Sequence, residues 1–206
     1  MLFQLLLSSP FEFLLVAGAL VISLTIHEFA HAFVADKLGD PTPGIQGRVT
    51  LNPLAHLDPL GTLMILFVGF GWGKPVVFDP YNLRHPKRDT ALIALAGPAS
   101  NLILALILAI GLQVIPLTPL IASVIALVIR INVGLAIFNL IPIHPLDGGK
   151  ILIGLAPKSV AHEWDELLHQ YGSIILIMLI LPLNNGRSAV SSLISPIVGA
   201  ILQVLL

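Results

Sequence analysis

The chain has no cysteine, so disulfide bonds and thiolate metal sites are excluded, and any metal must be bound by histidine, aspartate or glutamate. Charged residues are also scarce: they make up 10% of the 206 residues, whereas an ordinary soluble domain contains about 25%. The net charge of −1 gives no indication of nucleic-acid binding. With 56% hydrophobic residues and a mean hydropathy of +0.98, the composition predicts a membrane protein.

The amino-terminal segment lacks the marks of a cleaved signal peptide. Met1–Leu24 has neither a basic region at its start nor a small-residue cleavage site. We therefore interpret it as mature protein and expect residues 1–206 to form a single domain, long enough for one compact membrane bundle.

Long apolar segments predict membrane spans, each of which needs about 20 residues. The first ends at a charged exit, the second and third are separated by a turn containing Pro116 and Pro119, and two shorter runs follow a polar stretch. The chain is expected to cross the membrane about five times, at 11–34, 91–115, 117–141, 174–183 and 190–206.

Between the first two predicted spans the character of the sequence changes. Turn residues bracket short β-prone runs at 44–53 and 74–80, which predicts a few strands. The apolar stretch 60–70 is too short to cross and is expected to be re-entrant. The predicted fold class is mainly α: a polytopic membrane helix bundle with a small β-sheet and a re-entrant segment between the first two spans.

The basic residues predict the orientation, because cytoplasmic loops carry an excess of lysine and arginine. Two loops hold most of them: six lie between the first and second spans, and two follow the third. Both loops are expected to be cytoplasmic, with the amino terminus outside. These residues are Lys37, Arg48, Lys74, Arg84, Lys87 and Arg88, then Lys150 and Lys158.

A His-Glu-x-x-His motif lies within the uncharged first span. His27 and His31 are four residues apart, so on a helix they are about 40° apart around the axis and can reach one Zn²⁺. Glu28 lies beside them, where its carboxylate can take a proton from a water molecule. Because ionisable groups are costly inside a membrane, this group predicts a functional site in the cytoplasmic half of the span.

A catalytic zinc site usually has three protein ligands, so one more is needed. Asp147 is an acid at predicted membrane depth, in a stretch whose prolines and glycines allow an irregular backbone. We therefore predict Asp147 as the third ligand, with His144 as the alternative. The other four histidines lie in polar loops and are expected to be solvated; they are His56, His85, His162 and His169.

The residues resemble the site-2 proteases, a family of intramembrane zinc metalloproteases. The resemblance covers nearly the whole chain and rests on four motifs in the family's order. They are His27–His31, the stretch Gly47–Gly61 (GRVTLNPLAHLDPLG), Ala96–Asn101 (AGPASN), and Asn139–Pro142 leading into Leu146–Gly149 (LDGG).

This resemblance implies that His27, His31 and Asp147 bind one zinc ion and that Glu28 is the general base. It also implies that Asn139 helps to position or polarise the scissile peptide. The chain is similar to the minimal branch of the family, without PDZ or CBS domains. The expected protein is a multi-pass enzyme of the EC 3.4.24 type in a prokaryotic cell membrane, which cleaves single-span membrane proteins within the lipid bilayer.

Two other functions stay open from the sequence. A catalytically silent homologue would act as a scaffold for transmembrane partners, although Glu28 and the three predicted ligands are all present. A divalent-metal transporter would be expected to have several acidic or histidine sites along a path, whereas this chain has one cluster.

Overall fold

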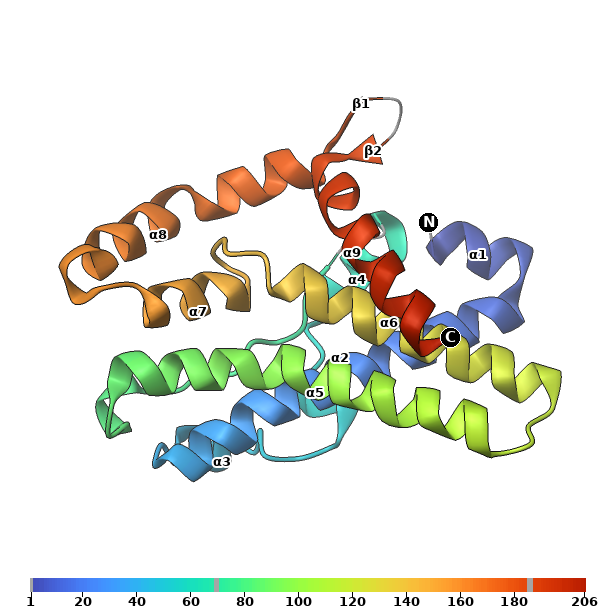
Figure 1. Cartoon of the computed structure of the whole chain (residues 1–206), viewed down its shortest axis with the longest axis horizontal. Helices are drawn as coiled ribbons and strands as arrows, with labels where there is room; N and C mark the ends of the chain where they lie inside the picture. The colour runs from blue at the N-terminus through green and yellow to red at the C-terminus, as the bar shows by residue number, and fades with distance from the viewer. Residues whose placement is uncertain (1, 69–70, 185–186) are drawn as a thin grey trace.

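Three long helices organise the computed structural model, which describes residues 2–68, 71–184 and 187–206 (Figure 1). They are α2 (Pro10–Leu38), α5 (Pro86–Val114) and α6 (Pro119–Asn139). Each begins with proline, whose missing N–H costs nothing in the first turn of a helix. All three are long and apolar enough to cross a membrane, so helices of sufficient length lie where the first three spans were predicted, and the predicted helical bundle is confirmed.

The other elements lie before, between and after these three helices. The remaining α-helices are α1 (Leu2–Ser8), α3 (Thr42–Ile45), α4 (Pro59–Val68), α7 (Asp147–Leu155), α8 (Lys158–Ile180) and α9 (Ala189–Leu205). Two single-turn 3₁₀ helices, η1 (Pro53–Ala55) and η2 (Pro80–Asn82), lie in the connection between α2 and α5. Two short antiparallel strands, β1 (Pro182–Asn184) and β2 (Arg187–Ser188), connect α8 to α9.

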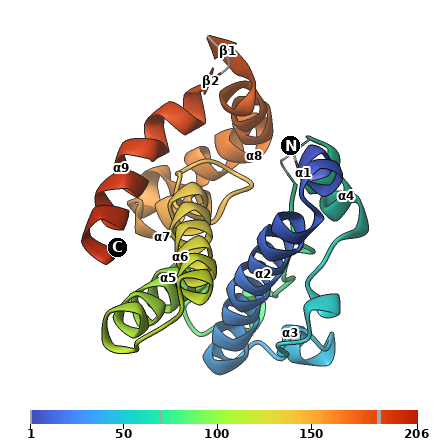
Figure 2. The ribbon, with the colours of Figure 1, turned by 90° about the vertical axis from the view of Figure 1, so that its right-hand side faces the viewer.

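Helix α5 packs against α2, α6 and α7, and Figure 2 shows it beside α6. On α5 the contact with α6 uses small side chains: Ala105 and Ala109 lie against Ile129 and Val133 of α6, and all four residues are buried. Small residues allow the two helix axes to approach closely, which increases van der Waals contact between the helices. Such contact stabilises helix association in a membrane, where the hydrophobic effect does not drive it. Residues of α9 cover the same cluster.

The carboxy-terminal half contains fewer candidate spans than the sequence predicted. Among the described residues, only α2, α5 and α6 have the length and composition of a span. The first half of α8 carries His162, Glu163, Asp165 and Glu166, and α9 has only 17 residues. The expectation of about five spans therefore exceeds what the helices support.

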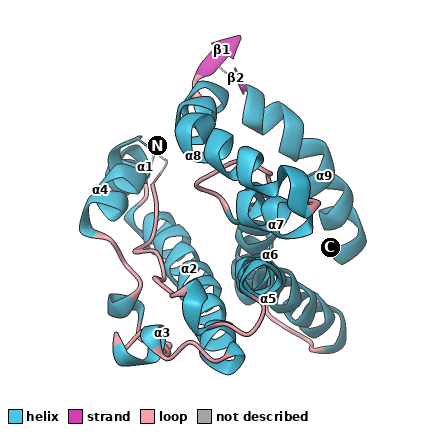
Figure 3. Cartoon of the chain, turned by 90° about the vertical axis from the view of Figure 1, so that its left-hand side faces the viewer, coloured by secondary structure: helices cyan, strands magenta, loops and turns pink. Residues whose placement is uncertain are grey.

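The predicted small β-sheet between the first two spans is wrong. The described residues between α2 and α5 form short helices and irregular chain, with one isolated bridge between Leu57 and Gly73 (Figure 3). The only regular strand pairing in the described chain lies far away, between β1 and β2. Residues 60–68 belong to the ten-residue helix α4, and Gly69 and Phe70 lie outside the described residues.

The side chain of Arg48 explains much of this difference. Its guanidinium donates hydrogen bonds to the backbone carbonyls of Ala55 and Lys74, and Lys74 is the first residue of the predicted strand 74–80. Pro75 and Pro80 also lack the N–H that a ladder requires. The β-prone composition was outweighed by a buried arginine and by proline.

Candidate metal centre

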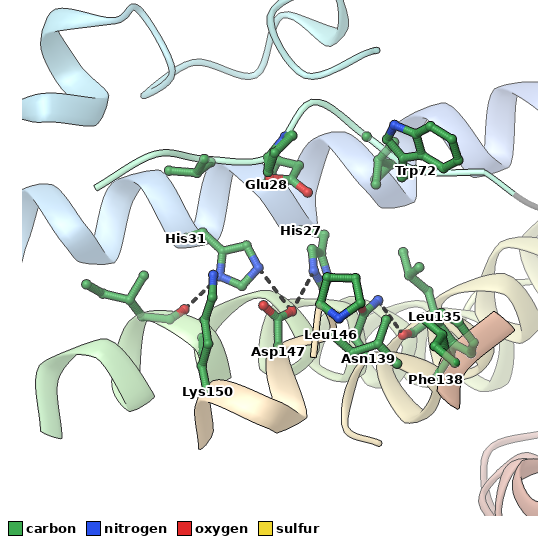
Figure 4. A pocket seen from close by; sticks show the side chains of 18 of the residues that line it. His27, Glu28, His31, Trp72, Leu135, Phe138, Asn139, Leu146, Asp147 and Lys150 are labelled. Atoms are coloured by element: carbon green, nitrogen blue, oxygen red, sulfur yellow. Dashed lines mark hydrogen bonds and ion pairs between the residues drawn. The ribbon is translucent and has the colours of Figure 1, made fainter. Parts of the chain in front are cut away.

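The two histidines of α2 meet an aspartate from the other half of the chain. His27 Nε2 lies 3.1 Å from Asp147 Oδ2, and His31 Nε2 lies 3.2 Å from the same oxygen (Figure 4). One ligand atom of each residue lies within 4.8 Å of the others. The structure thus brings together the three residues that were predicted as metal ligands, of which His27 and His31 are buried.

The opposite ring nitrogens of both histidines have hydrogen-bond acceptors. His31 Nδ1–H donates to the carbonyl oxygen of Ile93 at 2.7 Å, and His27 Nδ1 lies 2.6 Å from Asn101 Oδ1, which accepts when the hydrogen is on Nδ1. With hydrogen on Nδ1, each neutral ring directs the lone pair of Nε2 toward Asp147. Such a partner on the far nitrogen is usual for histidines that bind metals.

The donor set fits a zinc ion. Two imidazole nitrogens and one carboxylate oxygen form a usual catalytic zinc site, whereas calcium and magnesium prefer oxygen ligands throughout. When both Nε2 atoms are unprotonated, their lone pairs and the Asp147 carboxylate repel one another, and a metal ion bound among them removes this repulsion. His27, His31 and Asp147 together therefore offer a site for a metal cation.

Local sequence explains how Asp147 reaches α2. It is the first residue of α7, where the helix dipole favours a carboxylate. A Cβ on the next residue, Gly148, would lie 2.3 Å from the carbonyl oxygen of Ile141, so only glycine permits this close chain reversal. The close backbone approach expected at these glycines is present.

Helix α5 forms the wall behind the histidines, and it does so at Gly97. A Cβ at this position would lie 2.4 Å from His31 Nε2 and 2.6 Å from His27 Nε2. The absence of a side chain therefore leaves room for the two nitrogens that converge on Asp147. Gly97 belongs to the AGPASN motif.

Glu28 lies between the two histidines along α2 and lines the same cavity. Its carboxylate oxygen Oε2 is 4.0 Å from Nη2 of Arg48, which is itself buried. Arg48 thus connects the carboxylate to the loop whose carbonyls it binds at Ala55 and Lys74. The sequence had indicated Arg48 only as one of the basic loop residues.

A cavity of about 440 Å³ opens over the cluster. Apolar side chains dominate its lining, including Trp72, Phe78 and Leu135. Asn139 also lines it, and one hydrogen of its side-chain amide is donated to the carbonyl oxygen of Leu135 at 3.0 Å. The amide keeps a second hydrogen and its own oxygen for other partners.

The other histidines lie outside the cluster. The ring of His144 packs against that of His169 at a tilt of 41°, with centroids 4.2 Å apart, and His144 is absent from the group that converges with Asp147. His85, His162 and His169 are exposed, as predicted, but His162 and His169 lie on helix α8 and not in a loop. The prediction for His56 was wrong: it is fully buried and donates from Nε2 to the carbonyl oxygen of Thr50.

Two buried asparagines of the site had no predicted role. Asn101 contacts His27 directly, and Asn132 on α6 contacts Asn101. The available signal was that polar residues within apolar spans are costly and tend to be functional.

Several known proteins similar to this chain are named as zinc metalloproteases. Residues 117–181 match the model of "Peptidase family M50". YwhC of Bacillus subtilis, named as a candidate zinc metalloprotease, is 38% identical, with 86% of this chain and 90% of YwhC covered. Rip2 of Mycolicibacterium smegmatis, named likewise, is 34% identical, with 84% and 69% covered.

A more distant relative is MJ0392 of Methanocaldococcus jannaschii, named a zinc metalloprotease. It is 28% identical, and the match covers 78% of this chain and 40% of that protein. No solved structure matches the chain significantly. The identity to YwhC over most of both proteins, together with the family match, shows that the chain belongs to peptidase family M50, the site-2 protease family.

Proposed function

We propose that this chain hydrolyses a peptide bond in or near the transmembrane segment of a membrane-protein substrate, as in regulated intramembrane proteolysis. Family membership and three apolar helices make it an integral membrane peptidase. The observation that carries the proposal is the convergence of His27, His31 and Asp147 in a cavity that Glu28 also lines.

One zinc ion per chain would be held by His27 Nε2, His31 Nε2 and an oxygen of Asp147. When bound, zinc supplies a Lewis acid that lowers the pKa of a coordinated water toward about 7 and polarises a carbonyl. The names of the relatives, which include zinc, support this choice of metal.

Glu28 is proposed as the general base. Its carboxylate takes a proton from the attacking water and passes it to the leaving amine as the peptide bond breaks. The contact with Arg48 Nη2 helps to hold this carboxylate at the cavity wall.

Asn139 is proposed to bind the substrate backbone. Its free amide hydrogen can donate to the scissile carbonyl, while the bond to Leu135 holds the side chain in place. The apolar lining of the cavity suits side chains from a membrane segment, so single-span membrane proteins in the lipid bilayer are the expected substrates.

The basic residues support a site on the cytoplasmic side of a prokaryotic cell membrane. Six of them lie between α2 and α5 or in the adjoining turns of these helices, and Lys150 and Lys158 follow α6. With three spans, both regions face the same side, and the positive-inside rule makes that side cytoplasmic.

Purified protein in liposomes, with a membrane-embedded test substrate, tests the proposal. We expect one zinc per chain and cleavage that stops on chelation and returns with zinc. Bound zinc without cleavage of any membrane-embedded substrate would indicate a scaffold, and zinc transport into the liposomes would indicate a transporter. Either result would contradict the proposed proteolysis.

A further inference from the structure

A chain of hydrogen bonds extends from His27 into the membrane-spanning helices. Asn101 Oδ1 accepts from His27 Nδ1, and Asn101 Nδ2 donates to Asn132 Oδ1 at 2.7 Å and to the carbonyl oxygen of Ser23 at 3.0 Å. Asn132 Nδ2 donates to Ser23 Oγ and to the carbonyl oxygen of Val128, each at 2.8 Å. The chain thus connects α2, α5 and α6.

The hydrogen bonds in this chain have one consistent direction. Ser23 Oγ–H donates to the carbonyl oxygen of Ala19, which can only accept, so the hydroxyl accepts from Asn132. The Asn132 oxygen then faces Asn101, whose amide nitrogen donates to it. This leaves the Asn101 oxygen facing His27, and an oxygen there requires the hydrogen of the imidazole on Nδ1.

Burial makes an alternative arrangement costly. Ser23, Asn101 and Asn132 are fully buried, so reversing either amide would place two donors or two acceptors together without water. An unsatisfied buried polar group costs about 1–3 kcal/mol. His31 needs no such support, because its Nδ1–H donates to a backbone carbonyl whose direction the helix already determines.

We propose that Asn101 is a positioning residue that holds His27 in the tautomer with hydrogen on Nδ1, and that Asn132 sets the orientation of the Asn101 amide. The purpose is to keep the Nε2 lone pair directed at Asp147 Oδ2, 3.1 Å away. As far as it concerns zinc affinity, this inference rests on the proposed function. The tautomer itself does not depend on it.

Three variants separate positioning from packing. Asn101→Asp keeps an acceptor for His27 but loses both donated bonds, whereas Asn101→Leu has a similar size and loses the acceptor as well. Thr25→Ala is the matched control: it removes a buried hydroxyl of α2 that donates to the carbonyl oxygen of Val21 and lies outside the network of Ser23, Asn101 and Asn132.

Zinc affinity of the purified protein, measured by competition with a chelator, is the first readout. We expect Asn101→Leu to bind zinc about 10-fold to 100-fold more weakly, because partners of metal-binding histidines typically contribute that much. Asn101→Asp should retain much of the affinity that Asn101→Leu loses, and Thr25→Ala should stay near the parent protein. Equal losses in the aspartate and leucine variants, or no loss in either, would overturn the proposal.

The second readout needs no metal and no substrate. Long-range ¹H–¹⁵N spectra of metal-free protein, at a pH above the ordinary imidazole pKa, report which ring nitrogen carries the hydrogen. The His27 signals are those lost in His27→Gln. We expect hydrogen on Nδ1 in the parent protein and a mixture of tautomers in Asn101→Leu.

Hydrogen on Nε2 of His27 in the parent protein would refute the inference even if the enzyme cleaves its substrate. Conversely, hydrogen on Nδ1 in a protein that binds no zinc would uphold the tautomer assignment while the proposed function failed. The two readouts therefore distinguish failure of the inference from failure of the function.

Discussion

Gly97 of α5 lies so close to His31 that a Cβ on the glycine would be 2.4 Å from the Nε2 of the histidine. Real Cβ contacts are never this short, so any larger residue must displace the ring that faces Asp147. The lack of a side chain at Gly97 on α5 therefore determines where the His31 ring on α2 can lie.

Gly97→Ala is expected to weaken zinc binding and to lower the free energy of unfolding by about 1–3 kcal/mol, the usual cost of overpacking. Gly111→Ala on the same helix is the control, because a Cβ there meets nothing within 4 Å. Zinc content and thermal unfolding in detergent measure both effects. Unchanged zinc binding in Gly97→Ala would contradict the steric argument.

Glu28→Gln is expected to keep zinc and to lose proteolysis. The substitution preserves size and leaves His27, His31 and Asp147 in place, but an amide cannot act as a base. Loss of a general base typically lowers the rate by about 100-fold to 10,000-fold. Near-normal cleavage of a membrane-embedded substrate by this variant would show that another group accepts the proton.

Asp147→Ala should lose zinc, whereas His144→Ala should keep it. Asp147 Oδ2 lies 3.1 Å from His27 Nε2 and 3.2 Å from His31 Nε2, close enough for all three atoms to bind one zinc ion. The His144 ring instead packs against His169. Zinc stoichiometry of the two purified variants decides between them. If His144→Ala loses metal and Asp147→Ala retains it, the ligand assignment is wrong.

Asp40→Ala should destabilise the loop that follows α2. The buried carboxylate accepts from Thr42 N and Oγ1, from Asp79 N and from Asn82 Nδ2, so its loss leaves several donors unpaired. We expect a loss of several kcal/mol, at about 1–3 kcal/mol for each buried unpaired group. Chemical unfolding measures it, with Asp36→Ala, at an exposed position nearby, as the control.

The same carboxylate predicts a dependence of stability on pH. Burial by itself would raise the pKa of Asp40, but the hydrogen bonds from Thr42, Asn82 and Asp79 outweigh it and hold the pKa below its ordinary value. The stabilisation is therefore complete above an ordinary carboxyl pKa of about 3.9 and is lost as the pH falls below it. Asp40→Ala should remove this contribution to the loss of stability in acid. If the free energy of unfolding of the variant falls with decreasing pH as steeply as that of the parent protein, the prediction is wrong.

Single cysteines test the orientation in a chain that has none of its own. Ser159 lies in the polar first turn of α8 and Gln113 near the end of α5, at exposed positions predicted on opposite sides of the membrane. An impermeant thiol reagent added outside intact cells should label Gln113→Cys and not Ser159→Cys. The reverse pattern would invert the orientation.

The sequence by itself determined the parts of this protein that depend on neighbours along the chain. Four-residue spacing places His27 and His31 on one face of a helix because the helical repeat is local, and apolar length predicted α2, α5 and α6. The carboxylate of Asp147 was found by the scarcity of acids at membrane depth.

Tertiary structure decided the rest, because contacts between distant segments depend on packing that no local pattern encodes. Only the fold shows that Asp147 lies 3.1 Å from His27 across 120 positions of sequence, and that Asn101 Oδ1 lies 2.6 Å from the other ring nitrogen of His27. Packing also overruled β-propensity near Arg48, whose guanidinium binds the carbonyl of Lys74 at the start of a predicted strand. A side chain that hydrogen-bonds to groups distant in sequence can override the β-propensity of its own segment.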